Sequence, residues 1–205
     1  MKQKSSDRST VRGGLGLLAL RAVLGGSLVG HGAQKLFGSF GGEGLDDTAQ
    51  MFDANLGLEP EPLMAALAGV NELGGGALII TGLGGPIGPA SVMGVMTVAA
   101  RTAHRGKPYF VQMGGPELAI TNIAIASALG LTGFGRFSLD RRHHHSWPLL
   151  VRIAVMASGV ACGAWVASRA QQEQATRERA NERAVADAPA TAGNLATERV
   201  RQSAG

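Results

Sequence analysis

The sequence predicts an all-α membrane protein that crosses the bilayer several times. Charged residues gather at the N-terminus, between the apolar runs and in the last 37 residues. The five apolar stretches between them are each long enough to cross a hydrocarbon core of about 30 Å as a helix. Glu72 lies inside one of these stretches, and a charge facing lipid costs at least about 2.5 kcal/mol. The interior of the helix bundle is therefore expected to be polar at that point.

The predicted spans, in chain order, are residues 14–33, 63–83, 87–104, 118–134 and 148–168. The third is short and carries Arg101 near its end. Among 31 glycines, two pairs are spaced four residues apart: Gly26 with Gly30, and Gly159 with Gly163. Small residues at this spacing let membrane helices approach closely. The spacing favours helix packing over chance occurrence in a glycine-rich sequence.

The first span is expected to be a retained helix and not a signal peptide. Arg21 interrupts its apolar core, and no small-residue cleavage site follows before His31. The basic segment 1–13 precedes it and carries Lys2, Lys4, Arg8 and Arg12. By the positive-inside rule these residues place the N-terminus in the cytoplasm. The three bases in residues 101–107, which then lie outside, disagree with this orientation.

The acidic loop 38–62 has no basic residue and is expected to lie outside. Within it, Asp46 or Asp47 is predicted to cap a short helix that ends at Gly57. Its apolar side consists of Met51, Phe52 and Leu56. We expect this helix to lie on the membrane surface, with a lid over the polar interior as the alternative. Interface anchoring accounts for the aromatic residues near span ends: Phe37, Phe40, Tyr109, Phe110, Phe134, Phe137 and Trp147.

Ionisable residues on the first four spans define the candidate site. At about 1.5 Å per residue, the depths of Arg21 and Glu72 differ by about 6 Å, so Arg21 is the expected partner of Glu72. The same depth estimate places five further residues near the external surface: His31, Lys35, Arg101, His104 and Glu117. They can form one outward-facing pocket, in which the histidines and carboxylates provide a path for protons.

Each of these residues also has a structural explanation. The pair of Arg21 and Glu72 can simply fix the helix register. Lys35 and Arg101 can extend to lipid head groups, and Glu117 follows Pro116 at a helix start, where a carboxylate is favourable without any function. The two histidines can be interfacial. The run His143, His144 and His145 is better explained as a solvated loop than as a metal site, so no metal is predicted.

Several function classes are excluded by composition and motifs. Cys162 is the single cysteine, so neither an intramolecular disulfide nor a C-x-x-C relay is available. The sequence contains no P-loop, G-x-S-x-G or H-E-x-x-H motif. The tail 169–205 is predicted to be helical through about Val185 and disordered afterwards. Its six bases and five acids nearly balance, so we expect no nucleic-acid partner despite a pI near 9.8.

A series of landmarks in this chain resembles the DoxX family of membrane proteins. They are R-x3-G-x5-HG-x2-KL over residues 21–36, Leu56-Gly57-Leu58 with Pro60, Glu72 with Gly75 and Gly76, His104, Gly115 with Glu117, and GRFSLD over residues 135–140. The resemblance covers residues 14–140 and implies a four-helix bundle in the bacterial inner membrane. Loop 141–147, the fifth span 148–168 and the tail 169–205 are additions to that bundle.

The resemblance also implies a redox context. The family name comes from a subunit of thiosulfate:quinone oxidoreductase, and some members are described as membrane partners of superoxide dismutase and a sulfurtransferase. A quinone-linked subunit would use His31, His104 and Glu117 as pocket residues and Glu72 as a proton relay. Electrons would come from a partner protein, because the chain shows no ligand set for haem, flavin or an iron–sulfur cluster.

Two alternatives come from other functional classes. The chain can be a scaffold that recruits soluble redox or sulfurtransferase enzymes, as a monomer or as a homo-oligomer. It can also be a carrier for a small solute, although the first four spans show no inverted repeat of the kind many carriers have. A scaffold would tolerate loss of the buried charges as long as the bundle folds.

Overall fold

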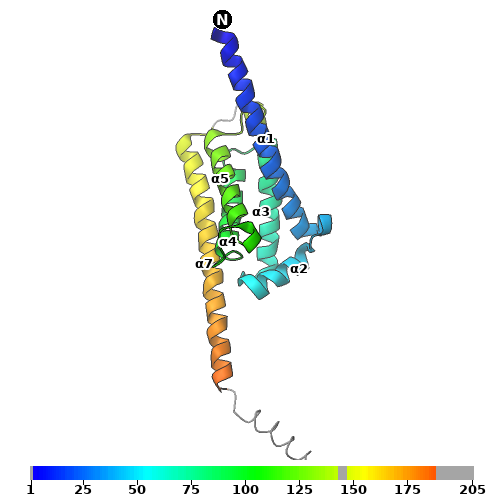
Figure 1. Cartoon of the computed structure of the whole chain (residues 1–205), viewed down its shortest axis with the longest axis vertical. Coiled ribbons are helices and arrows are strands. Elements are labelled where there is room, and N and C mark those ends of the chain that lie inside the picture. Colours follow the sequence, from blue (N-terminus) through cyan, green and yellow to red (C-terminus); the bar gives the residue numbers. More distant parts are fainter. Residues whose placement is uncertain (1, 143–146, 188–205) are drawn as a thin grey trace, which may run out of the picture. The chain divides into compact units, whose positions relative to one another are not determined.

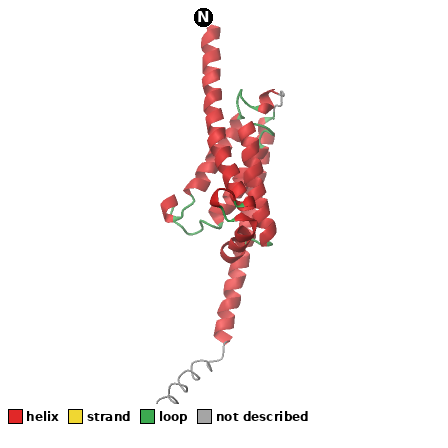
Figure 2. Ribbon diagram, turned by 90° about the vertical axis from the view of Figure 1, so that its right-hand side faces the viewer, coloured by secondary structure: helices red, strands yellow, loops and turns green. Residues whose placement is uncertain are grey.

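Helices joined by short turns form the whole of the described fold. The computed structural model describes residues 2–142 and 147–187, and Figure 2 shows no strand in that part of the chain. The chain divides into two units, residues 1–171 and residues 172–205. The predicted histidine loop around His143–His145 and the predicted disordered end of the tail lie outside the described residues.

Seven α-helices are described (Figure 1), namely α1 (Lys2–Phe37), α2 (Gly44–Met51), α3 (Glu61–Thr81), α4 (Ile87–Arg101), α5 (Glu117–Thr132), α6 (Leu139–Arg142) and α7 (Leu149–Asp187). Short turns of helix add η1 (Ser39–Gly41), η2 (Phe52–Leu56) and η3 (Val111–Met113). Each of the five predicted spans is a helix, which confirms the all-α fold class. The helical extension predicted through about Val185 is also confirmed, because α7 continues to Asp187.

Three of the described helices are long and apolar enough to cross a membrane: Arg12–Phe37, Glu61–Thr81 and Leu149–Ala186. The protein is therefore an all-α, multi-pass membrane protein. α4 and α5 have 15 and 16 residues, which corresponds to about 22 to 24 Å and is less than a bilayer core of about 30 Å. The predicted spans 87–104 and 118–134 are thus shorter as helices than expected, and a bilayer accommodates such helices by thinning locally.

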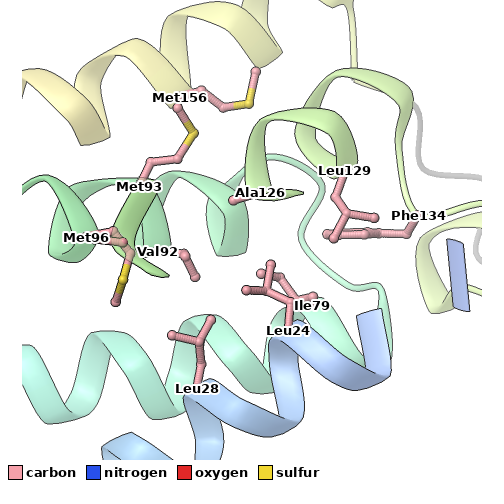
Figure 3. Close-up of a cluster of buried hydrophobic side chains, with 11 residues drawn as sticks. Leu24, Leu28, Ile79, Val92, Met93, Met96, Ala126, Leu129, Phe134 and Met156 are labelled. Carbon is pink, nitrogen blue, oxygen red and sulfur yellow. The ribbon is translucent and has the colours of Figure 1, made fainter. Parts of the chain in front are cut away.

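Four helices pack around one interior. α1 contacts α3, α3 contacts α4, α4 contacts α5, and α5 contacts α1. Figure 3 shows side chains from all four pointing inward, among them Leu24, Ile79, Val92 and Leu129, together with Met156 of α7. In lipid the hydrophobic effect does not drive such contacts, so close packing and interhelical polar contacts must hold the bundle.

Glycines bring α1 and α3 close together. A Cβ atom on Gly25 would lie 2.7 Å from the carbonyl oxygen of Gly76, and one on Gly32 would lie 2.7 Å from that of Gly69. Nothing in the described part of the chain lies within 4 Å of the corresponding positions on Gly26 and Gly30, so the predicted packing of that pair is wrong for the described residues. These two glycines point to a different side of α1, because successive residues are about 100° apart around a helix.

The other predicted glycine pair does pack closely. A Cβ atom on Gly159 of α7 would overlap the backbone of Ala90 in α4, and one on Gly163 would overlap the backbone of Gly94. Gly94 in turn faces Gly159, because a Cβ atom on Gly94 would lie 3.0 Å from the carbonyl oxygen of Gly159. The close approach of α7 to α4 therefore depends on small residues on both helices, as the spacing predicted.

The short helix in the acidic loop forms as predicted, but its start and its contacts differ. It begins at Gly44, with Asp46 and Asp47 inside its first turn and without a side-chain cap. There the carboxylates still complement the helix dipole. The helix continues through η2 and ends at Gly57, which has a φ of 63°. Its apolar side packs against protein, in a cluster formed by Ala49, Phe52, Leu56, Leu58, Ala65 and Ala170.

Candidate ion-pair site between α1 and α3

Lys35 and Glu72 form an ion pair between two apolar helices. The Nζ atom of Lys35 lies 2.6 Å from Oε2 of Glu72. The Glu72 side chain is 6% exposed and the Lys35 side chain is 25% exposed, so the carboxylate is enclosed while the ammonium reaches the protein surface. Lys35 is in the last turn of α1, where a cation is favoured by the helix dipole.

The predicted pairing of Arg21 with Glu72 is wrong, and the helix register explains why. At both glycine contacts between α1 and α3 the paired residue numbers add to 101. Arg21 is therefore level with residue 80, eight residues or about 12 Å along α3 from Glu72. Lys35 is level with residue 66, only six residues from Glu72, and its long side chain covers the remaining distance.

Arg21 instead binds four backbone carbonyl groups. Its guanidinium donates to the carbonyl oxygens of Ile79 at 2.8 Å, Ile80 at 2.5 Å, Phe134 at 3.1 Å and Phe137 at 3.2 Å. It also lies 5.7 Å from the centroid of the Phe134 ring, and Arg21 is only 1% exposed. Carbonyl groups in the last turn of a helix lack their usual donor four residues ahead. Arg21 provides donors to two of them in α3, and the N–H of Gly82 is a second donor to Ile79.

Two further charged residues have structural roles at the end of the bundle that holds Arg21, and the sequence analysis did not predict these roles. Asp140 accepts hydrogen bonds from the backbone N–H groups of Gly84 at 3.0 Å and Gly85 at 2.6 Å. Arg152 donates to the carbonyl oxygens of Trp147 and Gly130. Asp140 could have been found as the last residue of the landmark at 135–140, whereas Arg152 lies near a span start with no signal in its spacing.

His104 and Glu117 lie at the two ends of the loop between α4 and α5. His104 Nδ1 lies 2.6 Å from the carbonyl oxygen of Gly114. Glu117 Oε2 accepts a hydrogen bond of 2.9 Å from the backbone N–H of Val111. Both side chains therefore bind the backbone of this loop. This accounts for their positions without a ligand.

His31 and Arg101 have other contacts. His31 is exposed, and its Nδ1 lies 3.1 Å from Oε1 of Gln34. The exposed Arg101 accepts a hydrogen bond of 2.7 Å through its backbone carbonyl from Gln171 of α7. Of the predicted site residues, the structure thus joins Lys35 to Glu72 and places His104 and Glu117 in one loop.

A polar contact between α3 and α4 lies next to Glu72, and the sequence analysis did not predict it. Asn71 precedes Glu72 in α3, and its Oδ1 accepts a 2.6 Å hydrogen bond from Ser91 Oγ of α4. Asn71 also donates to the carbonyl oxygen of Leu67 at 2.8 Å. The sequence feature that could have predicted this contact is the position of the Asn71 amide directly before Glu72 in an apolar run. Residues 71 and 72 together link α3 to α1 on one side and to α4 on another.

The chemistry available here is hydrogen bonding and proton exchange. A lysine ammonium donates, and a carboxylate accepts or carries a proton. In the part of the chain that the structure describes, no group of three or more His, Cys, Asp or Glu side chains is arranged to hold a metal ion. The site therefore suits an uncharged or anionic polar group that accepts a hydrogen bond from Lys35.

Comparison with known families identifies the first part of the chain. The DoxX family model matches residues 16–105, a range that holds Arg21, Lys35, Glu72 and His104. The predicted landmarks at Glu117 and at 135–140 lie beyond the matched range. Comparisons with curated proteins and with solved structures find no match. Residues 16–105, which run from α1 through α4 and contain the ion pair, are therefore similar to the DoxX family.

Proposed function

We propose that this protein is the membrane subunit of a quinone-linked redox assembly in the bacterial inner membrane, with its N-terminus in the cytoplasm. In this proposal the ion pair of Lys35 and Glu72 meets the quinone head group. The observation that carries the proposal is the pair itself, a 2.6 Å contact between two apolar helices with an enclosed carboxylate and a partly exposed ammonium.

A purely structural role accounts well for the contacts of Arg21, but less well for the ion pair of Lys35 and Glu72. The register of α1 on α3 is already fixed by the contacts of Gly25 and Gly32, and by the bonds of Arg21 to the end of α3. Two charges within apolar helices are costly and usually mark a ligand or proton pathway. The Lys35 side chain is 25% exposed, which leaves a route for a ligand to approach the pair from the protein surface.

The proposed chemistry assigns one task to each residue. The ammonium of Lys35 donates a hydrogen bond to a quinone carbonyl oxygen. The Glu72 carboxylate accepts protons from the aqueous side, one at a time, and passes them to the quinone, which takes up two protons as two electrons arrive from a partner protein. His31 lies one turn before Lys35 on the same face of α1 and is exposed, so it can pass protons to this pair. His104 and Glu117 position the loop between α4 and α5.

Thermal unfolding with and without a short-chain quinone analogue tests this proposal. The purified protein is expected to unfold at a higher temperature with the analogue, and Lys35→Met and Glu72→Gln are expected to lose this increase. Each variant is compared with itself, so a lower starting stability does not confuse the result. Glu173→Gln serves as a matched control, because Glu173 forms an exposed pair with Arg177 in α7.

The outcome that contradicts the proposal is equally clear. If the unfolding temperature of both Lys35→Met and Glu72→Gln rises with the analogue as much as that of the parent protein, the pair is not the binding site. If no protein responds, including the parent, the quinone itself is the wrong ligand class.

A scaffold is the second candidate, and the length of α7 favours it. The last turns of α7, in the second unit, carry exposed charged residues that a membrane anchor does not need, including Arg179, Glu182 and Arg183. A soluble redox or sulfurtransferase enzyme could bind there. Replacing Arg179 and Arg183 by Glu in the full-length protein should then remove co-purified enzymes without changing the response to quinone.

A further inference from the structure

The segment between α5 and α7 has two different sides. Phe134, Ser138 and Asp140 are buried. The residues between and after them are exposed: Arg136, Phe137, Leu139, Arg141 and Arg142. Within ten residues the chain thus presents three arginines and two apolar side chains outward. This combination suits the boundary between lipid tails and head groups.

The inward residues explain why the arginines point outward. Both carboxylate oxygens of Asp140 are bound by the backbone N–H groups of Gly84 and Gly85, and Ser138 Oγ accepts a hydrogen bond from the backbone N–H of Arg141. These bonds fix the backbone of α6. They also turn the nearest acid away from Arg141 and Arg142, so that it does not neutralise them.

The contacts of the aromatic residues in this segment are typical of a membrane interface. Gly85 leaves room for the Trp147 ring, because a Cβ atom there would overlap the indole. The Arg136 side chain crosses α1 at Gly14, with its guanidinium 5.4 Å from the centroid of the Phe137 ring. Tryptophan at head-group depth and arginine extended along apolar surface are both typical of an interface.

The opposite end of the bundle differs in charge. Its loop between α4 and α5 also has three bases, Arg101, Arg105 and Lys107. However, loop 38–62, which enters α3 at the same end, contributes six acids and no base. The end that carries Arg141 and Arg142 is therefore the one whose surface favours an anion.

We propose that Arg136, Arg141 and Arg142 form a binding site for the phosphate group of anionic phospholipids beside Trp147. Arginine presents a planar set of donors that matches a phosphate with two parallel hydrogen bonds. The lipid tails would then lie along the exposed Phe137 and Leu139. This site is independent of the ion pair of Lys35 and Glu72.

Tryptophan quenching by brominated lipids tests the site directly. The chain has two tryptophans, so Trp165→Phe leaves Trp147 as the only one. This protein is placed in nanodiscs that contain brominated phosphatidylglycerol or an equal amount of brominated phosphatidylcholine. Trp147 is expected to be quenched preferentially by the anionic lipid, with a preference on the order of fivefold per arginine in contact.

Variants at the two ends of the bundle separate a site from general attraction. Arg141→Gln with Arg142→Gln should reduce the preference by at least about fivefold, whereas Arg105→Gln with Lys107→Gln should leave it unchanged. All four side chains are exposed, so neither double variant is expected to unfold. Replacement of Arg141 and Arg142 by Lys should keep part of the preference, because the charge remains but the paired donors are lost.

Two results would overturn the proposal. Equal quenching of Trp147 by both lipids in the Trp165→Phe protein shows that the segment does not select anionic lipid, and this comparison needs no arginine variant. An undiminished preference in the variant without Arg141 and Arg142 shows that the attraction comes from elsewhere.

Discussion

At the residue scale, Arg21 has the most demanding environment in the described structure. Four backbone carbonyl groups accept hydrogen bonds from the guanidinium of Arg21, a residue that is 1% exposed. In a bilayer no water replaces a lost donor, and an unsatisfied polar group costs several kcal/mol. Arg21 therefore acts as a structural centre that joins α1, α3 and the loop after α5, through backbone carbonyl groups and not through the predicted pair with Glu72.

Substitution of Arg21 tests this role. Arg21→Met should lower the free energy of unfolding by about 3 kcal/mol or more, because buried acceptors lose their donor. Arg21→Lys should recover little of this loss, since an ammonium cannot reach four separate carbonyl oxygens. The measurement is denaturant unfolding in detergent, with Arg12→Gln as the exposed control on the same helix. Full stability of Arg21→Lys would mean that only the charge matters.

The ion pair of Lys35 and Glu72 gives a second prediction at this scale. Lys35→Met leaves an enclosed carboxylate without a partner and should cost about 3 kcal/mol, whereas the double variant Lys35→Met with Glu72→Met should be more stable than Lys35→Met alone. A double-mutant cycle of unfolding free energies measures this coupling. Strictly additive effects of the two substitutions would show that the side chains do not interact.

The sequence indicated which of these residues are unusual but not how they pair. Arg21 and Glu72 stood out because each is an ionisable group in an apolar run. Their pairing was inferred from depth, which assumed span ends and ignored the register between helices. That register is set by Gly25 and Gly32 against α3, and nothing in the spacing of charges reports it. Lys35, read as a residue that extends to lipid, is the partner.

At the element scale, the two glycine pairs show the limit of a spacing rule. Gly159 and Gly163 pack against α4, whereas Gly26 and Gly30 face no other part of the described chain within 4 Å. Both pairs have the same spacing, so the difference lies in the side of the helix to which they point. The existence of the helices was predicted reliably because it rests on long apolar runs. Their lengths were predicted less well, since α4 and α5 are shorter than the predicted spans.

Matched alanine substitutions test this distinction. Gly159→Ala and Gly163→Ala should each lower the melting temperature, since a methyl group would overlap the backbone of Ala90 or Gly94. Gly26→Ala and Gly30→Ala meet no neighbour and should leave it unchanged or raise it slightly, because alanine has the higher helix propensity by about 1 kcal/mol. Equal losses at all four positions would contradict the packing of α7 on α4.

At the scale of the whole bundle, the two ends serve different purposes. One end is closed by bonds from Arg21, Asp140 and Arg152 to the backbone of α3, α5 and the loops beyond them. The other carries the ion pair of Lys35 and Glu72. Rigid closure at one end leaves the proposed chemistry at the other on helices whose register is fixed. The sequence predicted a polar interior but not this division, which depends on contacts between residues 22 to 113 positions apart.

Removal of Asp140 should reveal how far this closure extends. Asp140→Ala takes away the acceptor for the N–H groups of Gly84 and Gly85, so hydrogen exchange should become faster at those amides and at the amide of Asp140, which donates to Gly82. Exchange in α3 around Glu72 should stay slow, because the glycine contacts with α1 hold that region independently. Asp47→Ala, an exposed carboxylate in α2, serves as the control. If exchange instead rises throughout α3, the two ends are coupled and Asp140 also determines the geometry of the ion pair.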